Sequence, residues 1–286
     1  MRLPWAKPAA PPAPPTHRLE AILHDVERVR PLPTSVARVV QALDDPKVSA
    51  DYIAHLLGLD QALAAETLRI SNAAAAGGVR RTASVQEAVV RLGFVRIKSV
   101  ALGAATGTLL TRRLSGYGLS GAELWSHAVV TASLARYVAE RVSYPDFEEA
   151  YVAGLLHDIG KLVLDQYVRS GHGLLTDVMR TKRLALWQAE ELVFGMDHGA
   201  VGGLLAAKWQ FPLALAEAIR CHHWPTLART RPELAAIVNI ADALPPRPAA
   251  LLASALQPHP EALRLVHLDE LDLERLRAEM PWQPGM

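Results

Sequence analysis

Apolar residues recur every three or four positions along almost the whole chain from Leu19 onward, as in Val36, Val39, Val40 and Leu43. This interval places apolar side chains on one face of an α-helix. No alternation of apolar and polar residues, the pattern of a half-buried strand, continues for more than about four residues. Hydrophobic residues make up 50% of the 286 residues, which is enough for a buried core. The sequence therefore predicts an all-α protein.

Proline and glycine divide this helical pattern into segments. Residues 1–18 are rich in Pro and Ala and predict a disordered, extended arm. Residues 19–115 predict an N-terminal helical lobe, and the glycine-containing stretch 112–121 predicts a hinge. Residues 120–245 predict a second lobe, with helices at about 122–142, 147–168, 182–194, 198–209, 212–223 and 232–244. Residues 246–286 predict a tail with one amphipathic helix near 268–280.

The charge balance argues against nucleic acid as a partner. Lys and Arg total 30 against 29 Asp and Glu, a formal net charge of +1. Such a chain has no global positive field to attract a polyanion. A modest basic cluster is explained by a solvated helix face, and its members are Arg80, Arg81, Arg91, Arg96 and Lys98.

Membrane insertion and secretion are not expected either. No apolar run approaches the roughly 18 residues that a spanning helix needs, and prolines interrupt the N-terminus where a secretory signal would need an apolar core. The single cysteine, Cys221, cannot form an internal disulfide. We therefore expect a cytoplasmic protein.

The strongest chemical signal in the second lobe is His157-Asp158, which follows the apolar run 153–156. A charged carboxylate in such surroundings is costly unless it is paired or binds a cation. On a continuous helix, Lys161 would share a face with both residues. Lys161 could hold a substrate phosphate beside a metal, or it could simply form an ion pair with Asp158.

Further candidate ligands lie in or at the ends of other helices of this lobe. Glu123 precedes His127 by one turn, a spacing found in helical metal sites, although a core histidine and a solvated glutamate would give the same pattern. His198 lies in a first turn, where a histidine is usually on the surface. His222 and His223 end a helix, where they could share an ion or interact with the helix dipole. The other six of the 11 histidines, His259 among them, form no pattern and are expected in surface, arm or tail positions.

Asp242 is the second aspartate in an apolar run, and taken together these residues predict a metal site with N and O ligands. Six or seven ligands exceed what one tetrahedral ion needs, and they suit two ions bridged by a carboxylate, for which Asp158 is the natural choice. Fe, Mn, Zn, Co or Ni fits such ligands better than Ca. Two such ions would activate water and clamp a phosphate.

The run GLLHDIGK at residues 154–161 resembles the signature of the HD superfamily of metal-dependent phosphohydrolases. Other segments resemble the HDOD (HD-related output) branch, among them Leu32-Pro33, Ile70-Ser71-Asn72, Leu124 to His127, Phe194 to His198 and His222-His223. The likeness covers about residues 30–245. It implies a two-lobed helical bundle that acts as an output module of bacterial signalling, with a signalling protein or a nucleotide as its partner.

The resemblance to the related HD-GYP phosphodiesterases also implies a ligand set. The first metal would take His127, His157, Asp158 and Asp242. The second would take Asp158, His198, His222 and His223, and Glu123 matches a carboxylate used for an additional ion.

Two functions remain open from the sequence. One is a regulatory signalling module that retains the metal site, and the other is a phosphohydrolase or phosphodiesterase acting on a nucleotide or cyclic nucleotide. In the enzyme, Asp158 and Lys161 would be the catalytic residues. The Gly-Tyr-Pro stretch expected after the histidine pair is replaced by WPTL at residues 224–227, which counts against cyclic di-GMP hydrolysis.

Overall fold

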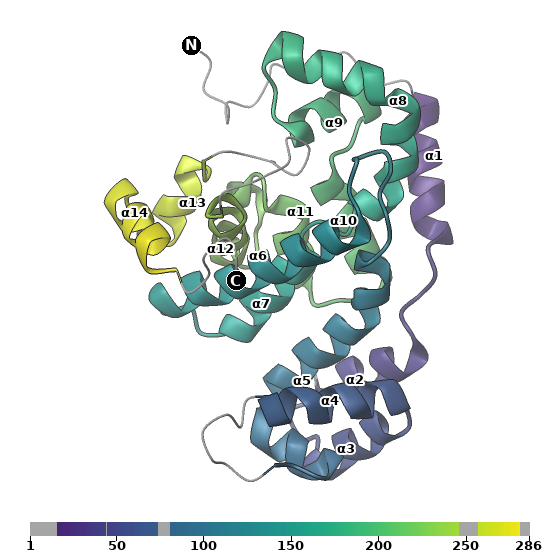
Figure 1. Cartoon of the computed structure of the whole chain (residues 1–286), viewed down its shortest axis with the longest axis vertical. Coiled ribbons are helices and arrows are strands. Elements are labelled where there is room, and N and C mark those ends of the chain that lie inside the picture. The colour runs from purple at the N-terminus through teal and green to yellow at the C-terminus, as the bar shows by residue number, and fades with distance from the viewer. Residues whose placement is uncertain (1–15, 44, 74–80, 246–256, 281–286) are drawn as a thin grey trace. The chain divides into compact units, whose positions relative to one another are not determined.

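The computed structural model describes residues 16–43, 45–73, 81–245 and 257–280, and its regular structure in these residues is helical, which confirms the all-α prediction (Figure 1). The exception is one isolated antiparallel bridge between Leu114 and Leu119. Contacts divide the chain into two compact units, residues 30–109 and the remainder. Within the described ranges, no helix combines the length and hydropathy needed to cross a membrane.

The smaller unit, residues 30–109, is formed by α2 (Thr34–Leu43), α3 (Ala50–Gly58), α4 (Gln61–Ala73) and most of α5 (Val85–Leu110). Ser49 begins α3 by accepting a hydrogen bond from the Tyr52 backbone N–H, as an N-cap does. Gly93 kinks α5, because its φ of 76° is a left-handed conformation that glycine adopts at little cost. Fully buried side chains form the core, among them Val39, Ile53, Leu57, Val89 and Ile97.

The larger unit is built around α12 (Pro232–Ala243), which is buried along nearly its whole length and contacts α6, α7, α11 and α13. α6 and α7 pack extensively against each other, as do α10 and α11. The other elements of this unit are α1 (Thr16–Arg28), α6 (Gly121–Arg141), α7 (Phe147–Leu156), α8 (Lys161–Lys182), α9 (Leu186–Phe194), α10 (His198–Lys208), α11 (Leu213–Cys221), the 3₁₀ helix η1 (Pro225–Leu227), α13 (Pro260–Leu265) and α14 (Glu270–Glu279).

Helix α1 belongs to this larger unit, although the sequence placed most of it in the N-terminal lobe. It contacts α8 and α10, and the Lys208 ammonium donates to the carbonyls of Val26, Glu27 and Val29 at its C-terminal end. A cation there satisfies carbonyls that lack helical partners. α1 begins at Thr16, within the segment expected to be a Pro/Ala arm, and residues 1–15 of that arm lie outside the described residues.

The continuous helix predicted for 147–168 is wrong, because α7 ends at Leu156 and α8 begins at Lys161. The turn between them, residues 157–160, is held by i→i+3 bonds, from Ile159 N–H to the Leu156 carbonyl and from Lys161 N–H to the Asp158 carbonyl. α8 then continues through residues 169–181, for which the sequence predicted no helix. Arg183, whose φ of 53° is left-handed, ends α8. The next helix, predicted to begin at residue 182, therefore begins at Leu186. The tail contains α13 in addition to the expected amphipathic helix.

Gly160 lets the 157–160 turn lie directly against the start of α10. A Cβ on Gly160 would lie 1.9 Å from the His198 carbonyl oxygen, and this backbone neighbour cannot rotate away. We expect Gly160→Ala to lower the free energy of unfolding by about 1–3 kcal/mol, measured by urea unfolding. Gly173→Ala, in open space in the middle of α8, is the control and should raise it by roughly 0.4–1 kcal/mol. Equal stability of the two variants would contradict this tight contact.

The stretch expected to be a hinge contains a packed loop of the larger unit, residues 114–119. Leu114 and Leu119 exchange backbone hydrogen bonds of 2.9 Å, and Leu114, Tyr117 and Leu119 are buried. The Gly116 N–H donates to Asp165 Oδ1 on α8 at 2.7 Å. The loop is therefore anchored to α8 and turns the Tyr117 side chain into the interior.

Candidate metal centre

Three predicted ligands converge to form what we call the first group: His127, His157 and Asp158. His127 projects from α6, whereas His157 and Asp158 lie in the 157–160 turn, in which His157 is the C-cap of α7. The Nε2 atoms of the histidines are 3.2 Å apart, and Asp158 Oδ2 lies 3.3 Å from that of His127 and 3.4 Å from that of His157. Ligand atoms held at 2.0–2.1 Å from one tetrahedral ion are about 3.3 Å apart. The triangle therefore has the dimensions of one face of a metal coordination shell.

Asp242, on α12, extends the first group. Its Oδ1 lies 3.3 Å from the Nε2 of His127 and 3.5 Å from the Nε2 of His157. Its side chain is almost completely buried, like the others. The structure thus brings together all four residues expected around the first metal.

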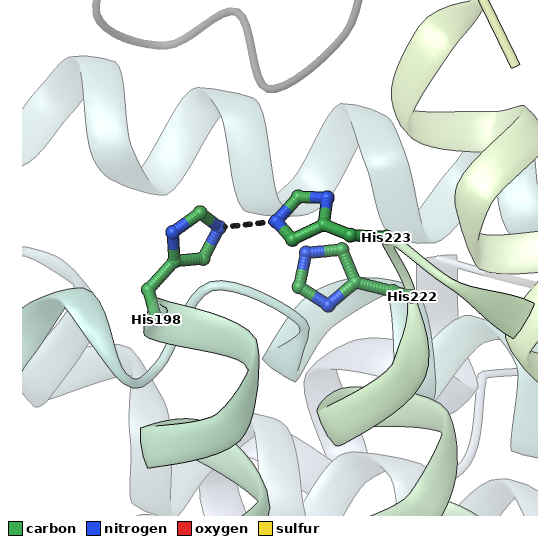
Figure 2. Close-up of side chains that lie close together, drawn as sticks. All are labelled: His198, His222 and His223. Atoms are coloured by element: carbon green, nitrogen blue, oxygen red, sulfur yellow. Dashed lines mark hydrogen bonds between the residues drawn. The ribbon is translucent and has the colours of Figure 1, made fainter. Parts of the chain in front are cut away.

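The second group comprises His198, His222 and His223, whose rings lie close together in Figure 2. His198 is the first residue of α10, which Asp197 caps by accepting from the Ala200 N–H. His222 and His223 follow the last residue of α11. The Nε2 atoms of His198 and His223 are 2.8 Å apart, and one ligand atom from each residue lies within 4.8 Å of the others.

The Asp158 carboxylate lies between the two groups. Its Oδ2 faces the first group, while its Oδ1 lies 3.2 Å from His198 Nε2 in the second. One carboxylate with an oxygen toward each ligand set is the arrangement of a bridging ligand in a two-metal site.

Local hydrogen bonds fix which ring nitrogen two of the histidines present. Nδ1 of His157 lies 2.7 Å from the Gly154 carbonyl oxygen, and Nδ1 of His222 lies 2.7 Å from that of Ile219. A carbonyl only accepts, so Nδ1 must donate, and in the neutral rings Nε2 carries a lone pair. His222 Nε2 is buried and has no hydrogen-bond partner among the described residues. Such a lone pair, surrounded by other imidazoles, fits a metal ligand, and both groups offer the N and O donors that transition metals prefer.

The pKa values of the site follow from burial and the nearby charges. Burial, with the charges of His157 and His198, lowers the pKa of His222 to about 3, so it remains neutral at physiological pH. Burial opposes ionisation of Asp158, but His157 and Lys161 outweigh it and hold the pKa of this carboxyl well below its usual range. Burial also disfavours charge on His198, yet the Glu190 carboxylate raises its pKa to about 9. Burial likewise disfavours charge on His127, yet Asp158 and Asp242 raise its pKa, so a cation bound here would compete with protons at His198 and His127.

Lys161 forms the ion pair that the sequence left open as an alternative. Its Nζ lies 2.6 Å from Asp158 Oδ2 and 5.9 Å from the centre of the Tyr117 ring, and its side chain is fully buried. Lys161 is the first residue of α8, and its ammonium compensates the charge of Asp158 beside both ligand groups.

Glu123 is the one predicted ligand that the structure does not bring to this centre. Its side chain is exposed, and it accepts hydrogen bonds from the backbone N–H and hydroxyl of Ser120 at 2.8 and 2.7 Å. Ser120 caps the Glu123 N–H in return, which forms a capping box at the start of α6. The carboxylate therefore stabilises a helix terminus.

Two supporting side chains were not found from the sequence. Glu190 is a fully buried carboxylate of α9 that accepts from the His198 ring, and it has no sequence signal like that at Asp242, because Gln188 and Glu191 interrupt the apolar residues around it. Asn239 donates to the His222 carbonyl at 2.7 Å and accepts from the His259 N–H at 2.7 Å. His259 lies in the predicted tail and is buried, because its chain segment packs onto α12 and η1.

The fold and this centre define an all-helical protein with residues that could hold two metal ions. The family model of the HDOD domain matches residues 29–225, more than half of the chain. The chain belongs to the HDOD family, as its sequence resemblance predicted.

Solved structures agree with this assignment. An HDOD domain protein of unknown function from Geobacter sulfurreducens is 27% identical, with a TM-score of 0.63 over 92% of this chain and 97% of that one. A candidate phosphohydrolase from Shewanella amazonensis SB2B is 22% identical, with a TM-score of 0.68 over 91% of this chain and 94% of that one. A candidate signal transduction protein from Marinobacter aquaeolei VT8 is 24% identical, with a TM-score of 0.68 over 92% of this chain and 62% of that one. The last two likenesses show the fold alone.

A curated relative, an uncharacterized protein of Treponema pallidum (strain Nichols), is 25% identical over 210 residues. The match covers 73% of this chain and 40% of that protein. The chain therefore spans less than half the length of this relative.

Proposed function

We propose that this chain is a regulatory module of HDOD-type signalling whose larger unit binds two divalent transition-metal ions. One observation carries the proposal: the two oxygens of Asp158 face separate ligand groups, His127 and His157 on one side and His198 on the other. Asp242 would complete the first set, and His222 and His223 the second. Fe, Mn, Zn, Co or Ni would suit these donors.

The role of the ions in such a module is to tie together elements that are distant in sequence. The ligands come from α6, the 157–160 turn, α10, α12 and the segment after α11. Their side chains are nearly inaccessible to solvent, with 8% exposure at His127 and 0% at Asp158. A site this enclosed supports a regulatory or structural role for the ions, with a signalling protein or a nucleotide as the partner of the module.

A metal-dependent phosphohydrolase or phosphodiesterase is the second candidate, favoured by Lys161. Bound metal would supply Lewis acidity and an activated water. Lys161 places a cation 2.6 Å from the proposed bridging carboxylate, where it could steady a phosphoryl oxygen. Catalysis would require a substrate to reach this enclosed centre.

Elemental analysis and a hydrolysis screen separate these possibilities. Protein purified without chelator should contain about two transition-metal ions per chain. We then expect phosphoesters and cyclic nucleotides to be hydrolysed no faster by the wild type than by Asp158→Asn. Turnover that this substitution abolishes would favour the enzyme, and protein without bound metal that takes up none on titration would refute the metal-binding module.

A further inference from the structure

Glu190 forms a buried hydrogen-bond centre beside the second group. Its Oε2 lies 2.6 Å from the His198 Nδ1 and accepts from the His198 backbone N–H at 2.9 Å. Its Oε1 accepts from the Tyr117 hydroxyl at 2.7 Å. Glu190 and His198 are fully buried, and Tyr117 is 1% exposed. Both oxygens of this carboxylate are therefore engaged away from solvent.

The consequence for His198 is a fixed ring. An ionised carboxylate only accepts, so the His198 Nδ1 must donate to Glu190. The Nε2 atom then points toward Asp158 Oδ1 at 3.2 Å and His223 Nε2 at 2.8 Å. His157 and His222 are oriented by carbonyls of their own helices, whereas His198 depends on a side chain from α9.

Tyr117 connects this arrangement to the 114–119 loop. The loop is fixed by the backbone bridge between Leu114 and Leu119 and by the hydrogen bond from Gly116 to Asp165. Tyr117 therefore lies in a segment whose backbone is anchored on either side of it. Its hydroxyl supports Glu190, and its ring lies 5.9 Å from the Lys161 ammonium, which pairs with Asp158.

We infer that Glu190 and Tyr117 are positioning residues that set the metal affinity of the second group through His198, and so make that affinity depend on the 114–119 loop. This inference rests on the proposed metal site. Loss of a carboxylate that orients a ligating histidine lowers metal affinity by about 10- to 100-fold. The first group should be spared, because neither His127 nor His157 contacts Glu190 through any described hydrogen bond.

Trp187 provides a signal from the second group that does not depend on activity. Its ring stacks on His223, with centroids 5.3 Å apart and planes 10° apart. Co²⁺ bound at His223 should quench the fluorescence of this tryptophan. The chain has six tryptophans, so the Trp187→Phe variant supplies the background to subtract.

The experiment titrates the metal-free full chain with Co²⁺ and follows total binding by calorimetry and Trp187 quenching by fluorescence. Glu190→Gln should lower the affinity for the ion that quenches Trp187 fluorescence by about 10- to 100-fold and leave the affinity for the other ion unchanged. Tyr117→Phe keeps the buried ring but removes the hydroxyl, and it should lower the affinity for the same ion by a smaller factor. Glu191→Gln, the neighbouring carboxylate on α9, is the matched control and should bind both ions like the wild type.

The outcomes distinguish this inference from the proposed function. If the wild type binds two ions and both variants bind them with wild-type affinity, the positioning role is wrong while the metal site stands. If the wild type binds no Co²⁺, the metal site itself is wrong. Equal weakening of both ions would also overturn the inference, because a general structural defect would produce it. Should Glu190→Gln fail to fold, Tyr117→Phe decides: selective weakening supports the role, and unchanged affinity overturns it.

Discussion

Replacing Asp158 by asparagine is expected to leave the purified protein nearly free of metal, whereas the wild type should carry about two ions per chain. The reason is the position of the carboxylate, whose two oxygens lie toward His127 and His198 at 3.3 and 3.2 Å. An asparagine keeps the shape but removes the negative charge and one of the two oxygens, so one site loses its oxygen ligand and the other keeps only a neutral amide oxygen, which binds a divalent ion more weakly. Elemental analysis of protein purified without chelator measures the result.

Glu123→Gln is the matched control for this prediction. It also replaces a carboxylate of the larger unit by an amide, but the Glu123 side chain is exposed and occupied with capping α6. Its metal content should equal that of the wild type. Retention of both ions by Asp158→Asn would show that Asp158 does not bridge, and loss of an ion from Glu123→Gln would restore Glu123 as a ligand.

Replacing Lys161 by methionine is expected to lower the free energy of unfolding of the metal-free protein by about 3–5 kcal/mol. The ammonium of Lys161 lies 2.6 Å from Asp158 Oδ2, and both side chains are fully buried. Methionine preserves most of the volume but leaves the buried carboxylate without its ammonium partner. Urea unfolding of chelator-treated protein measures the change.

Lys182→Met removes a lysine from the exposed end of the same helix and is the control. It should change the free energy of unfolding by no more than about 0.5 kcal/mol. Bound metal should reduce the effect at Lys161, since a cation then compensates the charge of Asp158. A Lys161→Met protein that unfolds at the wild-type urea concentration in both states would show that the pair contributes no net stability.

Most helices could be predicted from the sequence, because the spacing of apolar residues reports which face of a helix is buried. The division between α7 and α8 could not. It depends on the close approach of Gly160 to the backbone of His198, a contact between residues far apart in the chain. Local periodicity carries no information about such a contact, and the apolar run before His157 continues the helical pattern without interruption.

The candidate ligands could be predicted where burial made the side chain costly. His157, Asp158 and Asp242 lie next to or within apolar runs, and the structure brings them together. Glu123 was selected on helical spacing and on the resemblance to HD-GYP phosphodiesterases, although the Ser-x-x-Glu pattern with Ser120 indicates a capping box equally well. Glu190 was missed because one of its partners, Tyr117, lies 73 residues earlier.

The anchoring of α1 and α12 has a practical consequence for recombinant fragments. The family match spans residues 29–225, yet α1 precedes it and Asp242 follows it. A fragment with those limits would lack α1, whose terminal carbonyls accept from Lys208. It would also lack α12, the most buried helix of the larger unit, and with it the candidate ligand Asp242. Expression should therefore begin no later than Thr16 and extend at least through Ala243.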